Sequence, residues 1–536
     1  MLRYITCQAI ALLFCLTNVA QSFQSSNLPI VVINTNGNTI VDDPKIMADM
    51  GIIYNGEGVR NQITDPFNHY NGKIGIEYRG QSSQMFPMKS YGLELWNNAG
   101  SGVNRSIFGL PAESDWILYA PYTDKTLMRN VLAYTISREL GNWASHTRYV
   151  ELVVNGEYRG IYVFMEKIKR NVGRVNVMKL NSIDVAGDAV TGGYIFSIDK
   201  EADGWFSNYS AGTSRIQYSY IYPKLSSIVP AQQQYLARYV DSFETALNSP
   251  RFQDPLVGWR KFAQDSSFID YFIVNEISKN VDGYRISTFL NKNRNSIDSK
   301  IKAGPVWDYD LGFRNANYCN GELTSGWAWQ FNSVCPGDYF QVPFWWSVLN
   351  TDTAFQAKLL CRWKSLRTGT LSEAHLNHLI DSVATETNEA RNRHFAKWNT
   401  LGQYIWPNPN PIPTNYGEEI STLKSWLQQR LLWIDQHLNS IGGCANFPAD
   451  VKATAILSIH PNPVANPAII RVQSALQQTV TIEVISAVGQ KLFQQQYLVS
   501  KGVNTYALPS QHWAHGYYWL KMTTASGEII TDKFLK

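Results

Sequence analysis

Apolar and polar residues alternate in short runs through roughly the first two hundred residues, and turns rich in Gly or Asn separate these runs. A period of two residues is typical of half-buried strands. Asn155-Gly156 is typical of a two-residue hairpin turn. One helix is expected among the strands, over 125–140, with Asp124 as its cap and Gly141 at its end. The pattern predicts strands over 30–34, 73–78, 91–96, 149–154 and 160–166.

Beyond about residue 200 the spacing of apolar residues changes to that of helices. The run 268–277 is apolar nearly all round, which predicts a helix buried in the core. Gly442-Gly443 is expected to end the last helix, and residues 444–455 are expected to form a linker. Helices are predicted over residues 230–248, 267–279, 353–367, 372–398 and 417–440.

The last part of the chain, residues 456–536, returns to short alternating runs about ten residues apart. Val488-Gly489-Gln490 marks a hairpin turn between two of them. Many short strands separated by turn signals are typical of a sandwich of two sheets. The sequence therefore predicts a small all-β sandwich at this end.

Composition and the N-terminus indicate an exported protein of two or three domains. The chain has 536 residues, 44% of them hydrophobic, which is enough to bury a large core. Its net charge of +4 is small for this length, so nothing in the charge favours a nucleic-acid partner. Residues 1–22 combine Arg3, a short apolar run and small residues at the end, which predicts a secretory signal peptide. No later apolar run is long enough to predict a transmembrane segment.

Four cysteines remain once the expected leader is removed, namely Cys319, Cys335, Cys361 and Cys444. An even number in an exported protein is consistent with two disulfides, and four cysteines allow three pairings. Cys319 and Cys335 flank a loop rich in Gly and Trp, so we expect them to pair, which leaves Cys361 for Cys444. The spacing does not match that of a zinc site.

The strongest chemical signal is a pair of acidic turns, 280–285 (Asn-Val-Asp-Gly-Tyr-Arg) and 304–313 (Gly-Pro-Val-Trp-Asp-Tyr-Asp-Leu-Gly-Phe). Each sets a carboxylate among apolar and aromatic residues, on either side of a strand-like run. Such carboxylates are costly unless they bind a cation or a substrate proton. One acid holding a metal and the other orienting a nucleophile would suit phosphoryl transfer. The alternative is that Asp282 only caps a turn and Asp308 only anchors a loop.

These turns, together with three earlier motifs, resemble the CotH kinase family over roughly residues 28 to 400. The earlier motifs are 78–91 (Tyr-Arg-Gly-Gln-Ser-Ser, then Phe-Pro-Met-Lys-Ser-Tyr), 124–130 (Asp-Lys-Thr-Leu-Met-Arg-Asn) and 155–167 (Asn-Gly-Glu-Tyr-Arg-Gly-Ile-Tyr, then Glu-Lys). The resemblance implies an α+β fold like that of an atypical protein kinase. Its two lobes would be a strand-rich N-lobe over 23–200 and a helical C-lobe over 201–443.

The resemblance also implies roles for particular residues in a kinase that uses ATP and Mg²⁺, with Mn²⁺ as an alternative. Asp308 would bind the metal, with Asp310 second to it. Apart from the resemblance, Asn291 or Asn293, beyond the short strand, is a candidate for a further oxygen ligand. Asp282 would orient the Ser or Thr hydroxyl of a protein substrate. Around the nucleotide, Lys89 and Arg79 would contact phosphate, Ser82 and Ser83 would cover it, and Glu139 or Glu166 would orient Lys89. For Lys89 the alternative is a solvated lysine at a strand end.

The sequence departs from ordinary kinases in several places. No His-Arg-Asp triplet precedes Asp282, and Ser287 stands where an Asn would be expected. Neither a Gly-rich phosphate loop of the usual kind nor a Walker A motif is present. A cell-surface binding or adhesion protein on a kinase-like scaffold, with weak or no catalysis, is therefore the alternative function. A glycoside hydrolase using two of the acids is disfavoured, because the acids follow the order of the kinase family.

The C-terminal part resembles the sorting domain of the Bacteroidota type IX secretion system. The resemblance rests on the Pro461-Asn462-Pro463 opening, the Gly-x-Tyr-x-Leu pattern at 516–520 and the basic end, 533–536. It implies export by a signal peptide and then by the type IX machinery, to the outer cell surface or the medium. An accessory adhesion module is the alternative for this part.

Overall fold

The computed structural model describes residues 23–438, except 201, 202 and 213, and residues 454–536 with short gaps at 461–462, 465–466, 475–476, 501 and 525–528. The chain divides into two compact units, residues 1–441 and 442–536, and each is described by itself. The expected signal peptide and nearly all of the expected linker, 444–455, lie outside the described residues.

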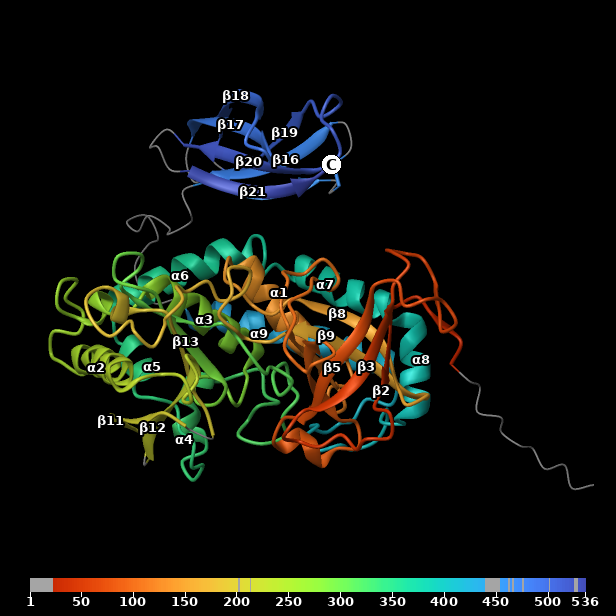
Figure 1. Ribbon diagram of the computed structural model, residues 1–536. Coiled ribbons are helices and arrows are strands. Elements are labelled where there is room, and N and C mark those ends of the chain that lie inside the picture. The colour runs from red at the N-terminus through yellow and green to blue at the C-terminus, as the bar shows by residue number, and fades with distance from the viewer. Residues whose placement is uncertain are drawn as a thin grey trace, which may run out of the picture. The chain divides into compact units, whose positions relative to one another are not determined.

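The first unit begins with a closed barrel of seven strands in the order β2-β3-β5-β6-β7-β9-β8 (Figure 1). Neighbours in the barrel are antiparallel except β2 and β8, which pair in parallel and close it. A short pair outside the barrel joins β1 (Ser25–Ser26) to β4 (Asn61–Gln62). The barrel strands are β2 (Ile30–Asn34), β3 (Ile46–Ile53), β5 (Tyr70–Arg79), β6 (Ser90–Trp96), β7 (Asp115–Tyr119), β8 (Thr147–Val154) and β9 (Glu157–Glu166).

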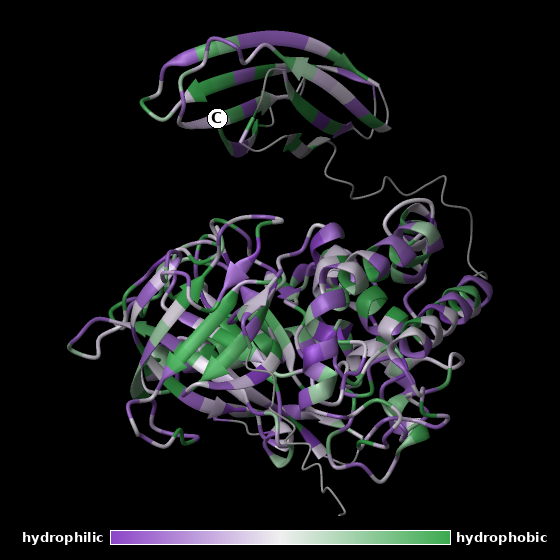
Figure 2. Cartoon of the chain, turned by 90° about the vertical axis from the view of Figure 1, so that its right-hand side faces the viewer, coloured by the Kyte–Doolittle hydropathy of each residue, from purple (hydrophilic) through white to green (hydrophobic). Residues whose placement is uncertain are grey.

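Alternation along these strands explains how the barrel is filled. Leu93 and Leu95 of β6 are buried among the apolar side chains inside, whereas Glu94 between them is partly exposed. The hydropathy colouring shows hydrophobic residues along the barrel strands (Figure 2). All five strands predicted for this half are confirmed, and Asn155-Gly156 turns between β8 and β9 as expected. Strands β3 and β7 were not predicted, and neither was the closure of the sheet.

Helix α1 (Arg129–Glu139) lies between β7 and β8 in the chain and begins four residues later than expected. Its N-cap residue is Met128 rather than Asp124, although the Asp124 side chain still accepts a hydrogen bond from the Arg129 N–H at 2.7 Å. Apolar residues at helical spacing are buried here: Leu127, Val131, Tyr134 and Leu140 all belong to the core shared with the helices that follow.

The expectation that helices take over after residue 200 is confirmed only in part, because a five-stranded sheet also forms there. Its order is β11-β12-β10-β13-β14. Helix α3 is buried along almost its whole length, as its apolar sequence predicts. The predicted helix 372–398 is two helices that meet at Thr387. The strands are β10 (Tyr194–Ile198), β11 (Trp205–Ala211), β12 (Ser214–Tyr222), β13 (Thr288–Lys292) and β14 (Ile301–Ala303). The helices are α2 (Pro230–Leu247), α3 (Asp265–Ser278), α4 (Phe331–Val334), α5 (Trp345–Leu349), α6 (Thr353–Arg367), α7 (Glu373–Glu386), α8 (Asn388–Lys397) and α9 (Tyr416–His437).

The second unit is all-β, as predicted. A three-stranded sheet, β15-β16-β19, and a four-stranded sheet, β18-β17-β20-β21, contribute side chains to one apolar core. Gly489, with a φ of 84°, makes the expected hairpin turn between β17 and β18. The strands are β15 (Thr454–His460), β16 (Ala468–Ser474), β17 (Gln478–Ser486), β18 (Lys491–Val499), β19 (Gly502–Leu508), β20 (Tyr517–Thr523) and β21 (Ile529–Leu535).

Two further expectations concern cross-links and membranes. The disulfide between Cys319 and Cys335 is present, with the two Cα atoms 5.7 Å apart. Cys444 lies outside the described residues, so its pairing with Cys361 stays a prediction. Among the described helices, none has the length and apolar character needed to cross a bilayer.

Candidate active site

The two acidic turns lie close together because one side chain joins them. Asp282 follows α3 and precedes β13, and Asp308 follows β14 in the same sheet. The side-chain oxygen of Asn280 accepts a hydrogen bond from the Asp282 N–H at 3.2 Å, and its amide donates to the Asp308 carbonyl at 3.2 Å. Asn280 is itself buried. A buried side chain, that of Asn280, therefore holds the two turns at a fixed separation.

The backbone of this region is unusual. Of the twelve described residues other than Gly with a positive φ, eight lie between 279 and 320, the segment that contains both turns. Asp308 has a φ of 63°, a conformation that Asp and Asn tolerate better than other side chains do. Such conformations cost about 1 kcal/mol or more each, and they persist where the surrounding contacts impose them. Their concentration here is typical of a functional site.

Burial and neighbouring acids raise the pKa values of Asp308 and Asp310. Burial raises the pKa of Asp308 to about 6, the negative charge of Asp282 adds to this, and Arg79 opposes it. Asp308 is nevertheless exposed to solvent, so its carboxylate is crowded by surrounding protein but remains open to a ligand. For Asp310, burial first and the Asp308 charge second raise the pKa well above its usual value. Tyr119 of β7 donates a hydrogen bond to Asp310 at 3.2 Å.

The start of α1 holds the second turn in place. Asn130 accepts a hydrogen bond from the Tyr309 N–H at 2.6 Å, and the Tyr134 hydroxyl accepts one from the Asp308 N–H at 3.2 Å. Arg129 pairs with Asp124 and also donates to the Phe313 carbonyl at 3.3 Å. This explains the motif at 124–130: it braces the backbone that carries Asp308 and Asp310.

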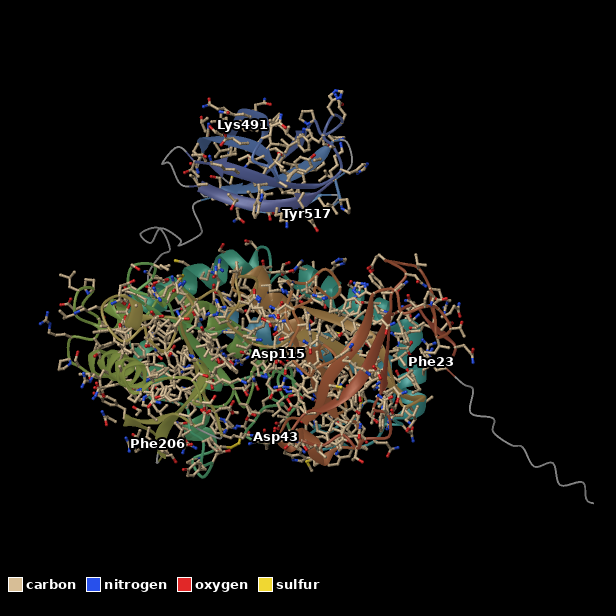
Figure 3. All side chains as sticks on the ribbon, viewed as in Figure 1. Phe23, Asp43, Asp115, Phe206, Lys491 and Tyr517 are labelled. Carbon is tan, nitrogen blue, oxygen red and sulfur yellow. A yellow bond between two sulfur atoms is a disulfide. The ribbon has the colours of Figure 1, made fainter. Side chains whose placement is uncertain are left out.

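A cavity of about 330 Å³ lies against the outer face of β5, β6 and β7. Asp43 and Asp115 are two of its lining acids (Figure 3). Arg79, at the end of β5, lines the cavity, and its guanidinium carbon lies 5.4 Å from the centre of the Trp307 ring. Burial lowers the pKa of Arg79 and the charge of Asp308 opposes this; the charge of Arg79 in turn opposes the rise in the pKa of Asp308. Arg79 therefore connects the cavity with the acidic turns.

Two cations in the cavity wall are not neutralised by neighbouring acids. Lys45 lies 3.4 Å from Glu94 and 3.7 Å from Glu77, so it is already paired. Within the described part of the chain, the side chains of Arg79 and Lys167 form neither a hydrogen bond nor an ion pair. Burial lowers the pKa of Lys167, and the Asp115 charge opposes this. Unpaired cations beside a cavity of this size suit an anionic ligand.

The expected pairing of Lys89 with a glutamate is wrong. The Lys89 ammonium donates a hydrogen bond to the Gln84 carbonyl. Glu139 instead lies 2.7 Å from His375 of α7, because its position at the end of α1 directs it toward that helix. Glu166 is buried and pairs with His146 at 2.8 Å and with Arg174 at 3.3 Å. Both glutamates thus pair with partners other than a lysine.

The remaining predicted residues divide between the site and the scaffold. Ser82 and Ser83 begin the short 3₁₀ turn Ser82–Met85, two residues after Gly80. Gly80 has a φ of 89°, and a Cβ there would lie 2.0 Å from the Ser83 hydroxyl, so this turn requires glycine. The Asn291 amide donates to the Gly304 carbonyl at 3.1 Å, and the Asn293 oxygen accepts the Met178 N–H at 3.1 Å. Both asparagines therefore have scaffold contacts, and no described contact joins either to Asp308.

The acids fit a magnesium ion that arrives with a substrate rather than one held by the protein alone. Among the described residues, no group of three or more His, Cys, Asp and Glu side chains is placed to hold a metal. Mg²⁺ usually takes one or two carboxylates together with phosphate oxygens and waters. Asp308 and Asp310 supply such hard oxygen ligands, and a cation beside them would relieve the charge crowding that raises their pKa values.

Sequence reasoning missed Lys167, Tyr119 and the connecting role of Asn280. Asn280 and Lys167 stood inside the quoted motifs, so proximity to Asp282 and Glu166 was an available signal. The partners of Asn280 and Tyr119 come from segments 28 and 191 residues away in the chain. Local patterns do not report such contacts.

Two family models match parts of this chain. A family model described as CotH kinase protein matches residues 76–434. A second, described as secretion system C-terminal sorting domain, matches residues 458–536. No curated protein matches. Among solved structures, a DUF3244 family protein with an immunoglobulin-like β-sandwich from Bacteroides vulgatus is similar at 14% identity, over 16% of this chain and 98% of that one, with a TM-score of 0.12.

The sorting domain indicates export by type IX secretion to the cell surface or the medium, and it implies the secretion machinery as a partner. The kinase model covers both acidic turns, the 124–130 motif and most of the barrel. The chain belongs to the CotH kinase family and ends in a type IX secretion sorting domain.

Proposed function

We propose that this protein is an exported atypical kinase that transfers the γ-phosphoryl group of ATP to a Ser or Thr hydroxyl of a protein substrate. The observation that supports this best is the grouping of Asp282, Asp308 and Asp310, whose charges act on one another beside Arg79 and its cavity. Phosphoryl transfer depends on positioning and on neutralising charge, and this arrangement supplies both kinds of group.

Each group has a separate task in the proposed reaction. Mg²⁺ or Mn²⁺, when bound, neutralises the polyphosphate, and Asp308 and Asp310 would hold it. Arg79 and Lys167 would bind the anionic part of the nucleotide, with Gly80, Ser82 and Ser83 covering it. Lys89 stays a candidate as well, because its one hydrogen bond leaves two of its three N–H donors.

Asp282 would orient the acceptor hydroxyl. One of its oxygens is paired with Arg285 at 2.8 Å, and the side chain is 15% exposed. Among the described residues nothing bonds to its second oxygen, so that oxygen can accept a hydrogen bond from an alcohol. One carboxylate oxygen is thus bonded to the protein, and the other is left for the substrate.

The second candidate is a surface binding protein with a kinase-like body. Its support is that, in the described chain, neither Glu139 nor Glu166 pairs with a lysine. In ordinary kinases a Lys–Glu ion pair must be in place for catalysis. A binding protein would keep the fold but would show no nucleotide-dependent chemistry.

Labelling by ATP separates the two candidates. The exported chain incubated with γ-labelled ATP and Mg²⁺ is expected to incorporate label on Ser or Thr, in itself or in an added protein, and a chelator is expected to abolish it. Label would be located by mass spectrometry of the digested protein. Absence of both labelling and ATP binding by calorimetry would favour the binding protein.

The labelling rate is expected to fall as the pH drops below about 6, the pKa of Asp308. A protonated carboxyl is a poor metal ligand, so each unit below the pKa should cost about tenfold in the free-enzyme rate. Raising Mg²⁺ should move the midpoint to lower pH, because metal and proton compete. The rate is measured against pH at two Mg²⁺ concentrations, and a midpoint that ignores Mg²⁺ would contradict the assignment.

The same pKa predicts the sign of a stability effect without metal. Because the folded pKa of Asp308 lies above the usual value of 3.8, the folded protein binds this proton more tightly than the unfolded chain does. The stability it contributes is therefore present at low pH and is lost as the pH rises through about 6. Added Mg²⁺ with nucleotide should restore stability at neutral pH more than at pH 5, which melting temperatures would show.

A further inference from the structure

Arg285 is buried beside Asp282, so neighbouring protein groups rather than water must stabilise its positive charge. Its side chain is only 2% exposed. Its Nε donates to the Val281 carbonyl at 2.8 Å, and one terminal nitrogen donates to the Asp282 carboxylate at 2.8 Å. One edge of the guanidinium is thus hydrogen-bonded to the turn that carries Asp282.

The rest of the guanidinium contacts a second part of the chain. Its other terminal nitrogen donates to the Asp338 carboxylate at 3.2 Å and to the Phe340 carbonyl at 2.9 Å. The Phe331 ring lies 3.9 Å from the guanidinium carbon. These three partners belong to residues 319–341, which we call the bridged loop. Arg285 therefore joins the bridged loop to the Asp282 turn.

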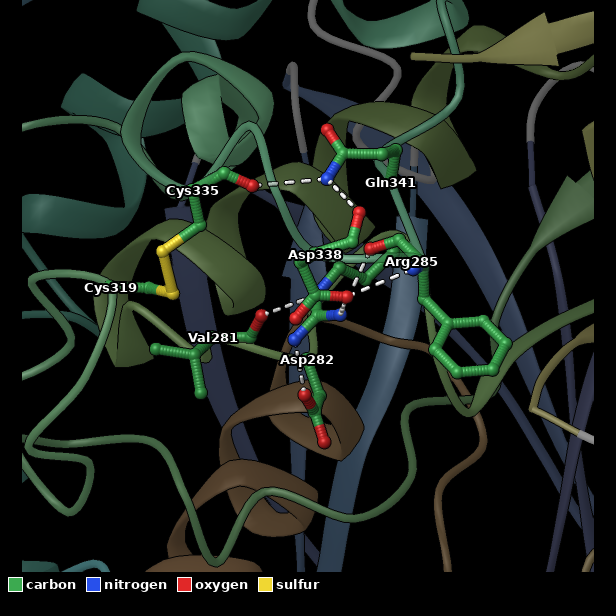
Figure 4. Close-up of a disulfide and its surroundings, with 8 residues drawn as sticks. Val281, Asp282, Arg285, Cys319, Cys335, Asp338 and Gln341 are labelled. Carbon is green, nitrogen blue, oxygen red and sulfur yellow. Dashed lines mark hydrogen bonds and ion pairs between the residues drawn. A yellow bond between two sulfur atoms is a disulfide. The ribbon is translucent and has the colours of Figure 1, made fainter. Parts of the chain in front are cut away.

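The Cys319–Cys335 disulfide and Gln341 fix the bridged loop around Arg285 (Figure 4). The Gln341 amide donates to the Cys335 carbonyl at 3.0 Å and to the Asp338 carbonyl at 2.6 Å. The chain that leads from the disulfide to Asp338 is thereby folded back on itself. Without the disulfide, the bridged loop would lose the cross-link that closes it, and Asp338 would be free to move away from Arg285.

We propose that Arg285 is a positioning residue, which aims the free oxygen of Asp282 at the acceptor hydroxyl, and that the disulfide holds Arg285 in place through the bridged loop. This inference rests on the proposed function. Asp282 has a single guanidinium partner at one oxygen, so loss of that partner lets the carboxylate rotate. A hydroxyl oriented by a rotating carboxylate attacks less often, whereas the nucleotide, held elsewhere, binds as before.

The arrangement predicts a separation of kinetic effects. Arg285→Met and the double variant Cys319→Ser/Cys335→Ser should lower kcat for acceptor labelling on the order of tenfold to a hundredfold. The dissociation constant for Mg²⁺-ATP should change by less than about threefold, because Arg79, Lys167 and Asp308 are untouched. Arg285→Lys, which keeps the charge but not the planar fork, should fall between wild type and Arg285→Met.

Arg367 provides a matched control. It too is an arginine beside an aromatic ring, Trp363, and it pairs with Asp435 at 3.1 Å. It joins α6 to α9 and contacts neither acidic turn. Arg367→Met should therefore lower the melting temperature without changing kcat at a temperature where the protein remains folded.

The experiment uses the full exported chain, with kcat from acceptor labelling, ATP affinity from calorimetry and folding from circular dichroism. If wild type neither labels nor binds ATP, the proposed function fails and this inference with it. If wild type labels and Asp282→Asn does not, yet Arg285→Lys and the double cysteine variant keep full kcat, only the inference fails. If Arg285→Met does not fold, these two variants decide. Equal losses of kcat in the Arg367 control and the Arg285 variants would also overturn it.

Discussion

Asp308→Asn is expected to lower the rate of ATP-dependent labelling roughly a thousandfold while leaving the fold intact. A metal ligand supplies several kcal/mol of transition-state stabilisation, and three powers of ten correspond to about 4 kcal/mol. Asn keeps the size of the side chain and tolerates the φ of 63° at this position. It also removes one of the charges that crowd Asp282 and Asp310, so the melting temperature should stay the same or rise.

Asp308→Ala separates the charge from the backbone. Its labelling should fall as far as that of Asp308→Asn, but Ala at a positive φ costs about 1–2 kcal/mol of stability that Asn does not. Labelling rates and urea denaturation of the two variants measure the two effects independently. An Asn variant that keeps more than about a tenth of the wild-type rate would show that Asp308 is not the principal metal ligand.

Arg430→Met is expected to destabilise the first unit by about 3–5 kcal/mol, because it leaves Glu276 as a buried charge without a counter-ion. The Arg430–Glu276 pair is 2.9 Å long, and the two side chains are 0% and 1% exposed. Arg430 also donates to the Thr324 and Gly326 carbonyls, at 2.8 and 2.6 Å. Denaturation followed by tryptophan fluorescence would measure the loss.

A surface pair on the same helix is the control for Arg430. Lys424 of α9 lies 2.6 Å from Asp381, but these side chains are 28% and 59% exposed. Lys424→Met should cost no more than about 0.5 kcal/mol, because water already screens that pair. Adding Glu276→Gln to Arg430→Met should recover part of the loss, since the buried charge is then gone. Similar costs for Arg430→Met and Lys424→Met would refute the argument from burial.

Elements with strong local patterns were predictable from the sequence. Strand β2 and helix α6 match the predicted bounds to the residue. Strand β3 carries Asp49 and Gly51 within its apolar run, which weakens the local signal, whereas β7 is as long as β2 and was missed without such a reason. The closure of the barrel depends on the pairing of β2 with β8, about 120 residues apart in the chain. A pattern read along the chain carries no information about such a pairing.

The candidate site divides in the same way. Asp282, Asp308 and Arg79 were found because they stand in recognisable motifs, and the structure brings them into electrostatic range of one another. The partner of Glu139 was predicted wrongly by analogy with ordinary kinases. His375, which contacts it, lies 236 residues further on and belongs to no motif. The family resemblance therefore located the acids, but it did not indicate which charges the scaffold had already neutralised.

The seven-stranded barrel has a consequence for how a nucleotide would enter and leave. An open sheet has edge strands that can bend or peel, but a ring of strands hydrogen-bonded on both sides moves as a rigid block. We therefore do not expect movement of the barrel strands to open or close the cavity outside the barrel. The turn at 80–85 borders this cavity through Gly80, and its Gln81 and Met85 are exposed. In the described chain, its middle is tied to other segments only by hydrogen bonds from Gln84 to Asp42 and from Lys89 to the Gln84 carbonyl, so we expect this turn to move when a nucleotide enters or leaves. Slow product release in this protein would then depend on a few residues of that turn rather than on a hinge between domains.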